Sequence, residues 1–180
     1  MGDGDHGTAM KRGFTEANNR IKNNLECNDP DTLLSMAGAG LAAGTGGASG
    51  LLFSSLFKEL AEAGTKMQRV GVPEFKIGLF NSIERIKKLG RSELGDKTML
   101  DALYPAYVAL EKIDDDTDLL TAVEQMVKNA KEGKSNTKNL PAKRGRGRYV
   151  ENRGIGTIDP GANSVTYIFE ILEHVLRSST

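Results

Sequence analysis

The sequence predicts an all-α fold, an antiparallel bundle or barrel of about seven amphipathic helices. Three observations predict it. Apolar residues recur at three-to-four-residue spacing along most of the 180-residue chain, as on the buried face of a helix. No segment alternates apolar and polar residues as a half-buried strand does. The periodic stretches are separated by short segments rich in Gly, Pro or Asp, which is typical of neighbouring antiparallel helices.

The first two helices are defined by an apolar stripe and by a start signal. The first helix carries a stripe made of Met10, Phe14, Ala17, Ile21 and Leu25. The second opens at Asp29-Pro30, an N-cap residue followed by proline at the first helical position. Its pattern, carried by Leu33, Leu34, Met36, Ala37 and Leu41, is broken by the glycine-rich run 44–50.

The third and fourth helices are recognised by where they stop. The third runs from Leu51 to about Ala63 and ends at Gly64. The fourth begins at Val72-Pro73 and ends with two lysines followed by Gly90. Basic residues in the last turn followed by glycine are a helix C-terminal signal.

The second half of the chain contains three further predicted helices and one long irregular segment. Helices are expected from near Lys97 through Leu110 and from Asp116 or Thr117 through Ala130. Residues 131–160 are rich in Gly, Lys and Arg and largely non-periodic, and long loops in compact domains tend to be functional or mobile. The closing helix follows Asp159-Pro160 and carries Val165, Ile168, Ile171, Leu172 and Val175.

Composition excludes several classes of function. Lys plus Arg equals Asp plus Glu, 24 each, so no global charge favours nucleic acid or a membrane surface. The single cysteine, Cys27, excludes an internal disulfide and fits a reducing cytosol. No apolar run approaches the roughly 20 residues of a membrane span, and the polar, acidic first residues are unlike a signal peptide. We therefore expect a cytoplasmic protein without nucleic-acid or membrane partners.

The first candidate site is the acidic turn Gly2–Gly7. Asp3 and Asp5 are separated by one glycine and can converge on one hard cation, and Mg²⁺ prefers one or two protein carboxylates plus phosphate oxygens and water. The helix that follows also attracts phosphate to its N-terminus. The alternative is an acidic terminus that only caps a helix.

The second candidate site is the run Gly44–Gly50, which lies between two predicted helices. Small residues expose successive backbone N–H groups, and the following helix directs its dipole to the same place, which suits phosphate. The run is neither a Walker loop, since no Gly-Lys-Ser/Thr follows, nor a Rossmann turn, since no strand precedes it. The alternatives are a flexible connector or a small-residue contact between closely packed helices.

Three later motifs are weaker. The basic run Ala142–Tyr149, with Arg153 after it, suits phosphate because arginine offers a planar fork; the alternatives are RNA binding or an ordinary solvated loop. The turns Asp159–Ala162 and Gly95–Met99 are most simply capping motifs. Met99 could pad a purine ring, although a methionine on a helix face usually belongs to the core.

Taken in order, the motifs GDGDHG, GGASG, GDKTM, GRGRY and GxxDPGA resemble the nucleotide-binding L subunit, or L domain, of dihydroxyacetone kinases over essentially the whole chain. The resemblance implies an antiparallel helical barrel that holds ADP or ATP at one end, with two Mg²⁺ ions bound by aspartates that Asp3 and Asp5 match. Arg146 is expected to act in catalysis as well as in binding. The expected nucleotide-binding residues are His6, Gly7, Thr8, Ala9, Gly46, Gly47, Ala48, Ser49, Gly90, Thr98, Met99, Arg146, Asp159, Pro160 and Gly161.

The sequence departs from the family pattern at its start. The family has a third metal-binding aspartate and an opening helix before the GDxDHG motif, and here Met1 directly precedes Gly2. We therefore expect residues 1–180 to form a single, N-terminally truncated L-type domain with weakened Mg²⁺ affinity. Uncovered apolar surface could favour a homodimer or aggregation. A smaller departure is Ala9, where many members carry asparagine.

The function expected from the resemblance is that of a phosphoryl-donor subunit. A separate K subunit would hold dihydroxyacetone or another short ketose, and phosphoryl transfer needs positioning and charge neutralisation above all. The donor is either ATP itself or bound ADP that a phosphotransferase-system M subunit rephosphorylates. His6 is interpreted as a nucleotide or metal contact rather than a phosphorylated histidine.

Three alternative functions stay open at this point. The nucleotide domain of fatty-acid kinases has a similar fold, but it typically carries threonine where His6 stands. A non-catalytic nucleotide-binding module that modulates a transcription regulator is the second alternative. An RNA-binding protein that uses its basic loop is the third.

Overall fold

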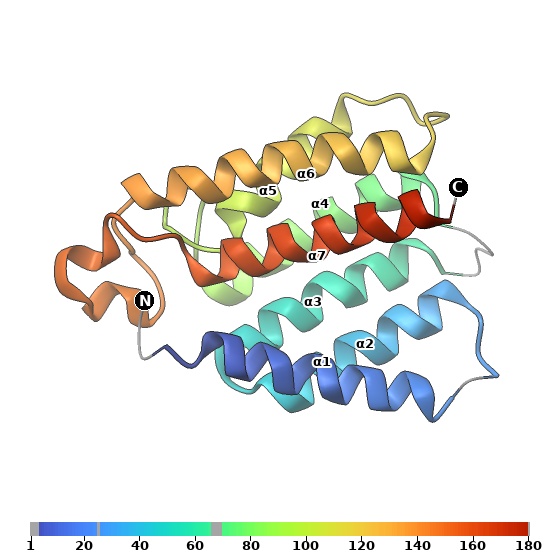
Figure 1. Cartoon of the computed structure of the whole chain (residues 1–180), viewed down its shortest axis with the longest axis horizontal. Helices are drawn as coiled ribbons and strands as arrows, with labels where there is room; N and C mark the ends of the chain where they lie inside the picture. The colour runs from blue at the N-terminus through green and yellow to red at the C-terminus, as the bar shows by residue number, and fades with distance from the viewer. Residues whose placement is uncertain (1–3, 25, 66–69, 180) are drawn as a thin grey trace. The chain divides into compact units, whose positions relative to one another are not determined.

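The computed structural model describes residues 4–24, 26–65 and 70–179 and contains seven α-helices and no strand within those ranges (Figure 1). The predicted all-α class is therefore confirmed. The helices are α1 (His6–Lys22), α2 (Pro30–Thr45), α3 (Gly47–Ala63), α4 (Val72–Gly90), α5 (Leu100–Glu111), α6 (Leu119–Asn136) and α7 (Pro160–Ser178). They group into two compact units, one over residues 4–90 with α1–α4 and one over residues 91 onward with α5–α7. The single domain expected over 1–180 stays a prediction.

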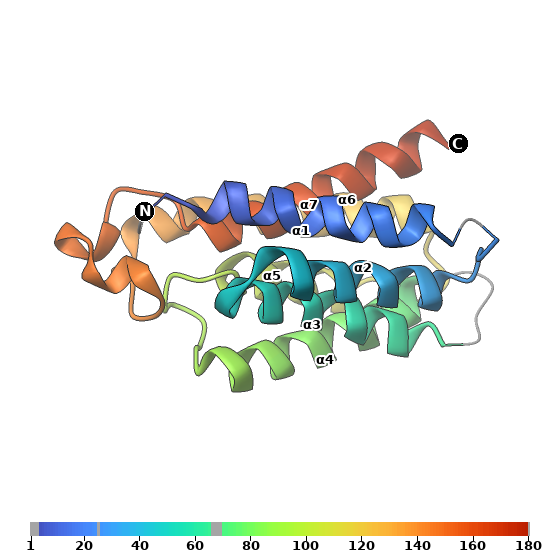
Figure 2. The ribbon, with the colours of Figure 1, turned by 90° about the horizontal axis from the view of Figure 1, so that it is seen from below.

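The unit of α1–α4 is held together where small residues let helices approach closely. A Cβ built on Gly13 of α1 would lie 2.0 Å from Thr45 Oγ1, and one built on Gly44 would lie 2.6 Å from the Arg12 carbonyl oxygen. Side chains larger than glycine do not fit such contacts. Because low numbers in α1 meet high numbers in α2, the two helices run antiparallel, as they do in Figure 2.

The other two pairs in this unit are also antiparallel. Gly50 of α3 faces the Leu41 carbonyl oxygen of α2, 3.2 Å from a Cβ built on the glycine. Ser82 of α4 donates its hydroxyl to the carbonyl oxygen of Leu56 in α3 at 3.3 Å and to that of Gly78 at 2.6 Å. Consecutive antiparallel helices place the starts of α1 and α3 at the same end of the unit.

Several predicted helix boundaries and part of the first predicted stripe differ from the structure. The helix expected from Leu51 begins at Gly47, and the helix expected to stop at Ala130 continues to Asn136. The helix expected from near Lys97 begins at Leu100, and the helix expected from Asp116 or Thr117 begins at Leu119. Phe14 is exposed, at 39%. Its neighbour Gly13, rather than Phe14, lies against α2, because only glycine fits the close contact there. Leu25, predicted to end the first stripe, lies outside the described residues.

The unit of α5–α7 is likewise antiparallel. A Cβ built on Gly133 of α6 would lie 2.0 Å from the carbonyl oxygen of Asp101 in α5. Between α6 and α7, Lys131 pairs with Glu170 at 3.0 Å, and Arg177 pairs with Glu124 at 2.7 Å. On α7 the buried positions are Ala162, Val165, Thr166 and Phe169. Ile171 and Val175, part of the predicted stripe, are about half exposed.

The irregular segment predicted before the last helix is built from three short 3₁₀ helices, Thr137–Asn139, Arg146–Tyr149 and Glu151–Gly154. Its two sides are joined by backbone hydrogen bonds. Gly156 N donates to the Lys138 carbonyl oxygen at 2.7 Å, and Ala142 N donates to that of Arg153 at 2.8 Å. The segment 137–159 therefore leaves α6 and returns to α7 with its two sides hydrogen-bonded to each other. Within the described ranges, every helix falls short of the length or the apolar character that spanning a bilayer requires.

Candidate functional site

The first half of the candidate site is the start of α1. Asp5 is the N-cap residue, yet its side chain makes no capping hydrogen bond, and the Asp5 carbonyl oxygen accepts from Ala9 N at 2.9 Å. The ring of His6 lies 6.2 Å from that of Phe53 in α3. Burial lowers the pKa of His6, and the nearby Asp5 charge only partly opposes this. The imidazole is therefore neutral at pH 7 and able both to donate and to accept.

The turn between α2 and α3 completes this end of the unit. Gly46 and Gly47 have φ of 72° and 58°, in the left-handed region that favours glycine. A Cβ built on either one meets nothing within 4 Å, so the space before them is open. No side chain caps the start of α3, and its first N–H groups are therefore available to an anion.

The glycine run contains two kinds of position. Gly44 and Gly50 lie against neighbouring helix backbone, as a small-residue helix contact requires, whereas Gly46 and Gly47 form the open turn. Gly90 lies at the end of α4. The pairing of Gly78 with Leu60 across α3 and α4, continued along both helices, brings Gly90 level with Ala48.

The α1–α4 unit therefore gathers most of the predicted nucleotide residues at one end. The first turn of α1 carries His6, Gly7, Thr8 and Ala9, and the first turn of α3 carries Gly47, Ala48 and Ser49. Ala9 is buried, at 8% exposure, and its N–H already donates to the Asp5 carbonyl oxygen.

The predicted metal pair is described only in part. Asp5 is exposed at the start of α1, and Asp3 lies outside the described residues. Within the described ranges, no group of three or more His, Cys, Asp or Glu side chains gathers as a metal cage would. One carboxylate beside two uncapped helix starts still fits Mg²⁺, which takes few protein ligands when phosphate oxygens supply the rest.

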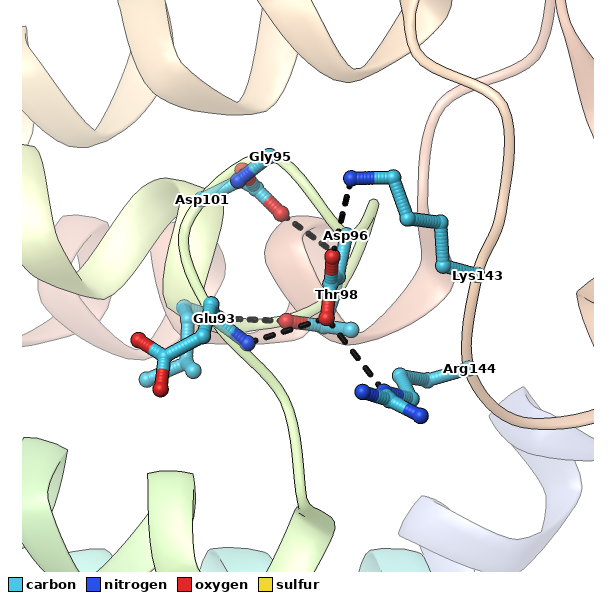
Figure 3. A network of polar contacts seen from close by, with 8 residues as sticks. Glu93, Gly95, Asp96, Thr98, Asp101, Lys143 and Arg144 are labelled. Atoms are coloured by element: carbon cyan, nitrogen blue, oxygen red, sulfur yellow. Dashed lines mark hydrogen bonds and ion pairs between the residues drawn. The ribbon is translucent and has the colours of Figure 1, made fainter.

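In the α5–α7 unit, the turn 93–99 is organised by two aspartates (Figure 3). Asp101 accepts from Gly95 N at 2.6 Å and from Thr98 N at 2.7 Å, one bond on each carboxylate oxygen. Asp96 accepts from Glu93 N at 3.0 Å. These bonds fold the turn that holds Thr98 and Met99, so the predicted capping role is carried by Asp101 as well as by the motif itself.

Asp96 also ties this turn to the basic run. Lys143 Nζ lies 3.1 Å and Arg144 Nε 3.3 Å from its two carboxylate oxygens (Figure 3). Burial by itself would raise the pKa of Asp96, but the hydrogen bond from Glu93 N and the Lys143 and Arg144 charges outweigh it, so the pKa lies below its usual value. Two cations of the basic run are therefore already paired with a carboxylate.

The turn before α7 lies against the same region. Asp159 caps α7 by accepting from Ala162 N at 2.8 Å, as predicted. A Cβ built on Gly161 would lie 3.2 Å from that of Met99, so the two predicted nucleotide segments are in contact. Met99 is 3% exposed and belongs to the packed core of this unit. Burial raises the pKa of Asp159 to about 6, helped by the Asp101 charge and opposed by the hydrogen bonds from Ala162 N and Gly161 N and by the Lys97 charge.

Arg146 lies apart from these turns, on the 137–159 segment. It opens the second 3₁₀ helix directly after Gly145, whose φ is 61°, and it is exposed. Its neighbour Arg148 stacks on the Tyr149 ring, 4.6 Å from the ring centroid to the guanidinium carbon.

Sequence reasoning missed the residue at the centre of this unit, Lys97. Its side chain is 1% exposed, and Nζ donates to the carbonyl oxygens of Thr137 at 2.5 Å and Thr157 at 2.6 Å. The acidic neighbours Asp96 and Asp101 were a signal that this lysine is paired, but nothing in the pattern points to acceptors 40 and 60 residues away.

Comparison with protein families finds the DAK2 domain model matched by residues 1–174. The ADP-binding subunit DhaL of PEP-dependent dihydroxyacetone kinase 2 from Listeria innocua is 32% identical over 180 residues, covering 99% of this chain and 83% of that protein. The corresponding Escherichia coli subunit is 31% identical over 173 residues, covering 96% and 82%.

A solved structure supports the fold independently. The dihydroxyacetone kinase of C. freundii, in its native form, matches 91% of this chain and 28% of its own with a TM-score of 0.63. At 24% sequence identity this likeness concerns the arrangement of the helices alone.

Proposed function

This chain belongs to the DAK2 domain family, and on that premise we propose that it is the nucleotide-binding, phosphoryl-donor subunit of a short-ketose kinase. The observation that carries the proposal is the joint position of two uncapped helix starts, α1 and α3, beside the open Gly46–Gly47 turn. Relatives that are named ADP-binding subunits and cover nearly the whole chain support the same conclusion.

The α1–α4 unit is proposed to hold the phosphates. The N–H groups of Gly47, Ala48 and Ser49 donate to phosphate oxygens, and the positive ends of the α1 and α3 dipoles favour their charge. His6, neutral and beside Phe53, offers a hydrogen bond at the same place. Gly90, level with Ala48 by the helix pairing, completes this end.

Asp5 is proposed as a ligand of Mg²⁺ carried on the phosphates, together with Asp3. Mg²⁺ supplies charge neutralisation of the phosphate oxygens when bound. The role of Asp5 is to hold the cation at the start of α1, where its carboxylate is exposed.

The α5–α7 unit contributes the remaining proposed contacts. Thr98 and Met99 lie in the turn folded by Asp101, and Asp159, Pro160 and Gly161 lie against that turn. Arg146 is proposed to offset negative charge that develops on the transferred phosphoryl group, since a guanidinium presents a planar pair of donors to phosphate.

We propose that a separate K-type subunit presents the ketose, because the relatives are named as ADP-binding subunits of dihydroxyacetone kinases. Relatives named PEP-dependent and ADP-binding favour bound ADP as a standing cofactor that an M-type phosphotransferase subunit rephosphorylates, over direct consumption of ATP. A nucleotide used in this way does not leave between turnovers, so purified protein should retain ADP through desalting.

The binding step is tested by calorimetry of the full chain with ADP and Mg²⁺. Asp5→Asn should weaken binding about tenfold or more, because it removes a charged ligand. Asp29→Asn is the matched control: Asp29 is also an N-cap residue without a capping bond, but it begins α2 at the opposite end of the same unit. Equal binding by wild type and Asp5→Asn would contradict the metal assignment.

Catalysis is tested by adding a K-type subunit and dihydroxyacetone. One arm supplies ATP, and the other supplies phosphoenolpyruvate with the phosphotransferase proteins. Ketose phosphate in the second arm alone supports the ADP-cofactor cycle, and product in the first arm supports direct use of ATP. Nucleotide binding without product in either arm would favour the non-catalytic module.

A further inference from the structure

The α5–α7 unit contains a buried cation that the proposed chemistry does not use. Lys97 lies in the turn 93–99 with φ of 61°, a conformation that non-glycine residues rarely adopt. Its side chain is 1% exposed. Burying an ammonium is costly unless it is paired and hydrogen-bonded, so its partners define its role.

Both hydrogen bonds of Lys97 go to the base of the 137–159 segment. Nζ donates to Thr137 O at 2.5 Å, where the chain leaves α6, and to Thr157 O at 2.6 Å, just before the chain enters α7. Thr137 makes a further link, since its hydroxyl accepts from Asp159 N at 3.0 Å. One ammonium therefore clamps the two ends of the segment together and onto the 93–99 turn.

The carboxylates facing this ammonium are Asp159 and Asp101, whose charges oppose the lowering of the Lys97 pKa that burial causes. Asp159 begins α7 and Asp101 folds the turn that holds Thr98. Lys97 thus contacts or faces every element of this unit that carries a proposed nucleotide residue, although it is not itself one of them.

We propose that Lys97 is a positioning residue, a buried ammonium that sets the relative placement of the 93–99 turn, Asp159 and the segment carrying Arg146, and thereby the affinity for nucleotide. The inference rests on the proposed nucleotide-binding function. A neutral side chain of the same length cannot replace it, because both carbonyl acceptors and both facing carboxylates would lose their cation.

The test compares Lys97→Met with Lys138→Met, the same substitution at an exposed lysine of the same segment. Affinity for ADP with Mg²⁺ is measured by calorimetry between pH 5 and 8. We expect Lys97→Met to bind on the order of tenfold or more weakly, with unchanged helical circular dichroism and faster tryptic cleavage within residues 143–153. Lys138→Met should match wild type. Equal affinity of Lys97→Met and wild type would overturn the proposal.

The pH profile separates positioning from mere loosening. The Lys97 charge adds to the hydrogen bonds from Ala162 N and Gly161 N in lowering the pKa of Asp159. Removing the ammonium therefore raises that pKa further, and the pH midpoint of nucleotide affinity should move upward in Lys97→Met. Loosening alone would lower affinity equally at every pH. His6 is common to both proteins and cancels in the comparison.

A measurement on the wild type covers the case in which the variant fails to fold. With ¹⁵N-labelled lysine, an ammonium held on two buried carbonyls should give a slowly exchanging signal at neutral pH, and the absence of any such signal would overturn the proposal. If wild type itself ignores nucleotide while this signal is present, the proposed function fails instead.

Discussion

Gly40 of α2 lies directly against the backbone of Ala17 in α1, where a Cβ built on the glycine would be 2.3 Å from the Ala17 Cα atom. The two helices are therefore as close as backbone allows. This contact fixes the start of α1 beside the Gly46–Gly47 turn, so a packing detail in the middle of the helices determines the geometry of the candidate phosphate site at their end.

Gly40→Ala is expected to lower the free energy of unfolding by about 1–3 kcal/mol, as overpacking does. The atoms nearest to the new methyl group belong to the Ala17 backbone and cannot rotate aside. The resulting steric strain costs more than the better helix propensity of alanine gains. Urea unfolding measures the change. Gly7→Ala is the control, since a Cβ there meets nothing within 4 Å, and it should be neutral or stabilise by up to about 1 kcal/mol. Equal midpoints for the two variants would contradict the close contact.

Thr45 carries a buried hydroxyl that has no hydrogen-bond partner in the part of the chain that the structure describes. Thr45→Val should therefore raise the free energy of unfolding by about 1 kcal/mol, because it removes an unsatisfied polar group. Thr166→Val should lower it by a similar amount, since that hydroxyl donates to the Ala162 carbonyl oxygen at 2.9 Å. Thermal and urea unfolding of both variants test the opposite signs, and destabilisation by Thr45→Val would count against the assignment.

Asp159 makes stability depend on pH. Its pKa is raised from 3.8 to about 6, so the folded state binds the proton more tightly than the unfolded state between these values. The free energy of unfolding therefore falls as pH rises from about 4 to 6, by on the order of 3 kcal/mol. Asp159→Asn keeps a side-chain oxygen for Ala162 N and should remove this fall in urea unfolding series.

Asp118 is a control, because it changes stability with pH in the opposite direction to Asp159. Hydrogen bonds from the Thr121 hydroxyl and N–H lower its pKa, so its contribution to stability is present above the unfolded-state pKa and is lost as pH falls. Asp118→Asn should therefore weaken the loss of stability in acid and leave the pH 4–6 fall caused by Asp159 in place. Identical pH slopes for wild type and Asp159→Asn would exclude the raised pKa.

Arg146→Ala should lower kcat of the assembled kinase about 10- to 100-fold, the cost of removing a charge-assisted contact to phosphate. Arg146→Lys should recover part of it, because lysine keeps the charge and loses the planar fork. Arg148→Ala is the matched control, since Arg148 stacks on Tyr149 and should leave turnover near wild type. Equal rates for Arg146→Ala and Arg148→Ala would remove Arg146 from the catalytic assignment.

Local signals in the sequence predicted the elements well. The Asp-Pro pairs at 29–30 and 159–160 mark the starts of α2 and α7 where the structure has them, and the residues Phe75, Leu79, Ile83 and Ile86 of α4 are buried as their spacing predicts. Helix starts and stripes depend on residues within one or two turns, so they can be inferred without knowing the fold. Boundaries inside the glycine-rich run and in the 137–159 segment were missed, because there the deciding contacts are distant in sequence.

By itself, the sequence determined the helical class, the order of the motifs and the family, since each depends on residue types at short spacing. Only the tertiary structure decided which glycines turn the chain and which admit a neighbouring helix, why Gly13 rather than Phe14 faces α2, and what Lys97 binds. Gly13 and Gly44 contact residues 32 positions away, and Lys97 binds acceptors 40 and 60 positions away. They depend on which backbone atoms packing brings together, and no local pattern of side chains encodes that.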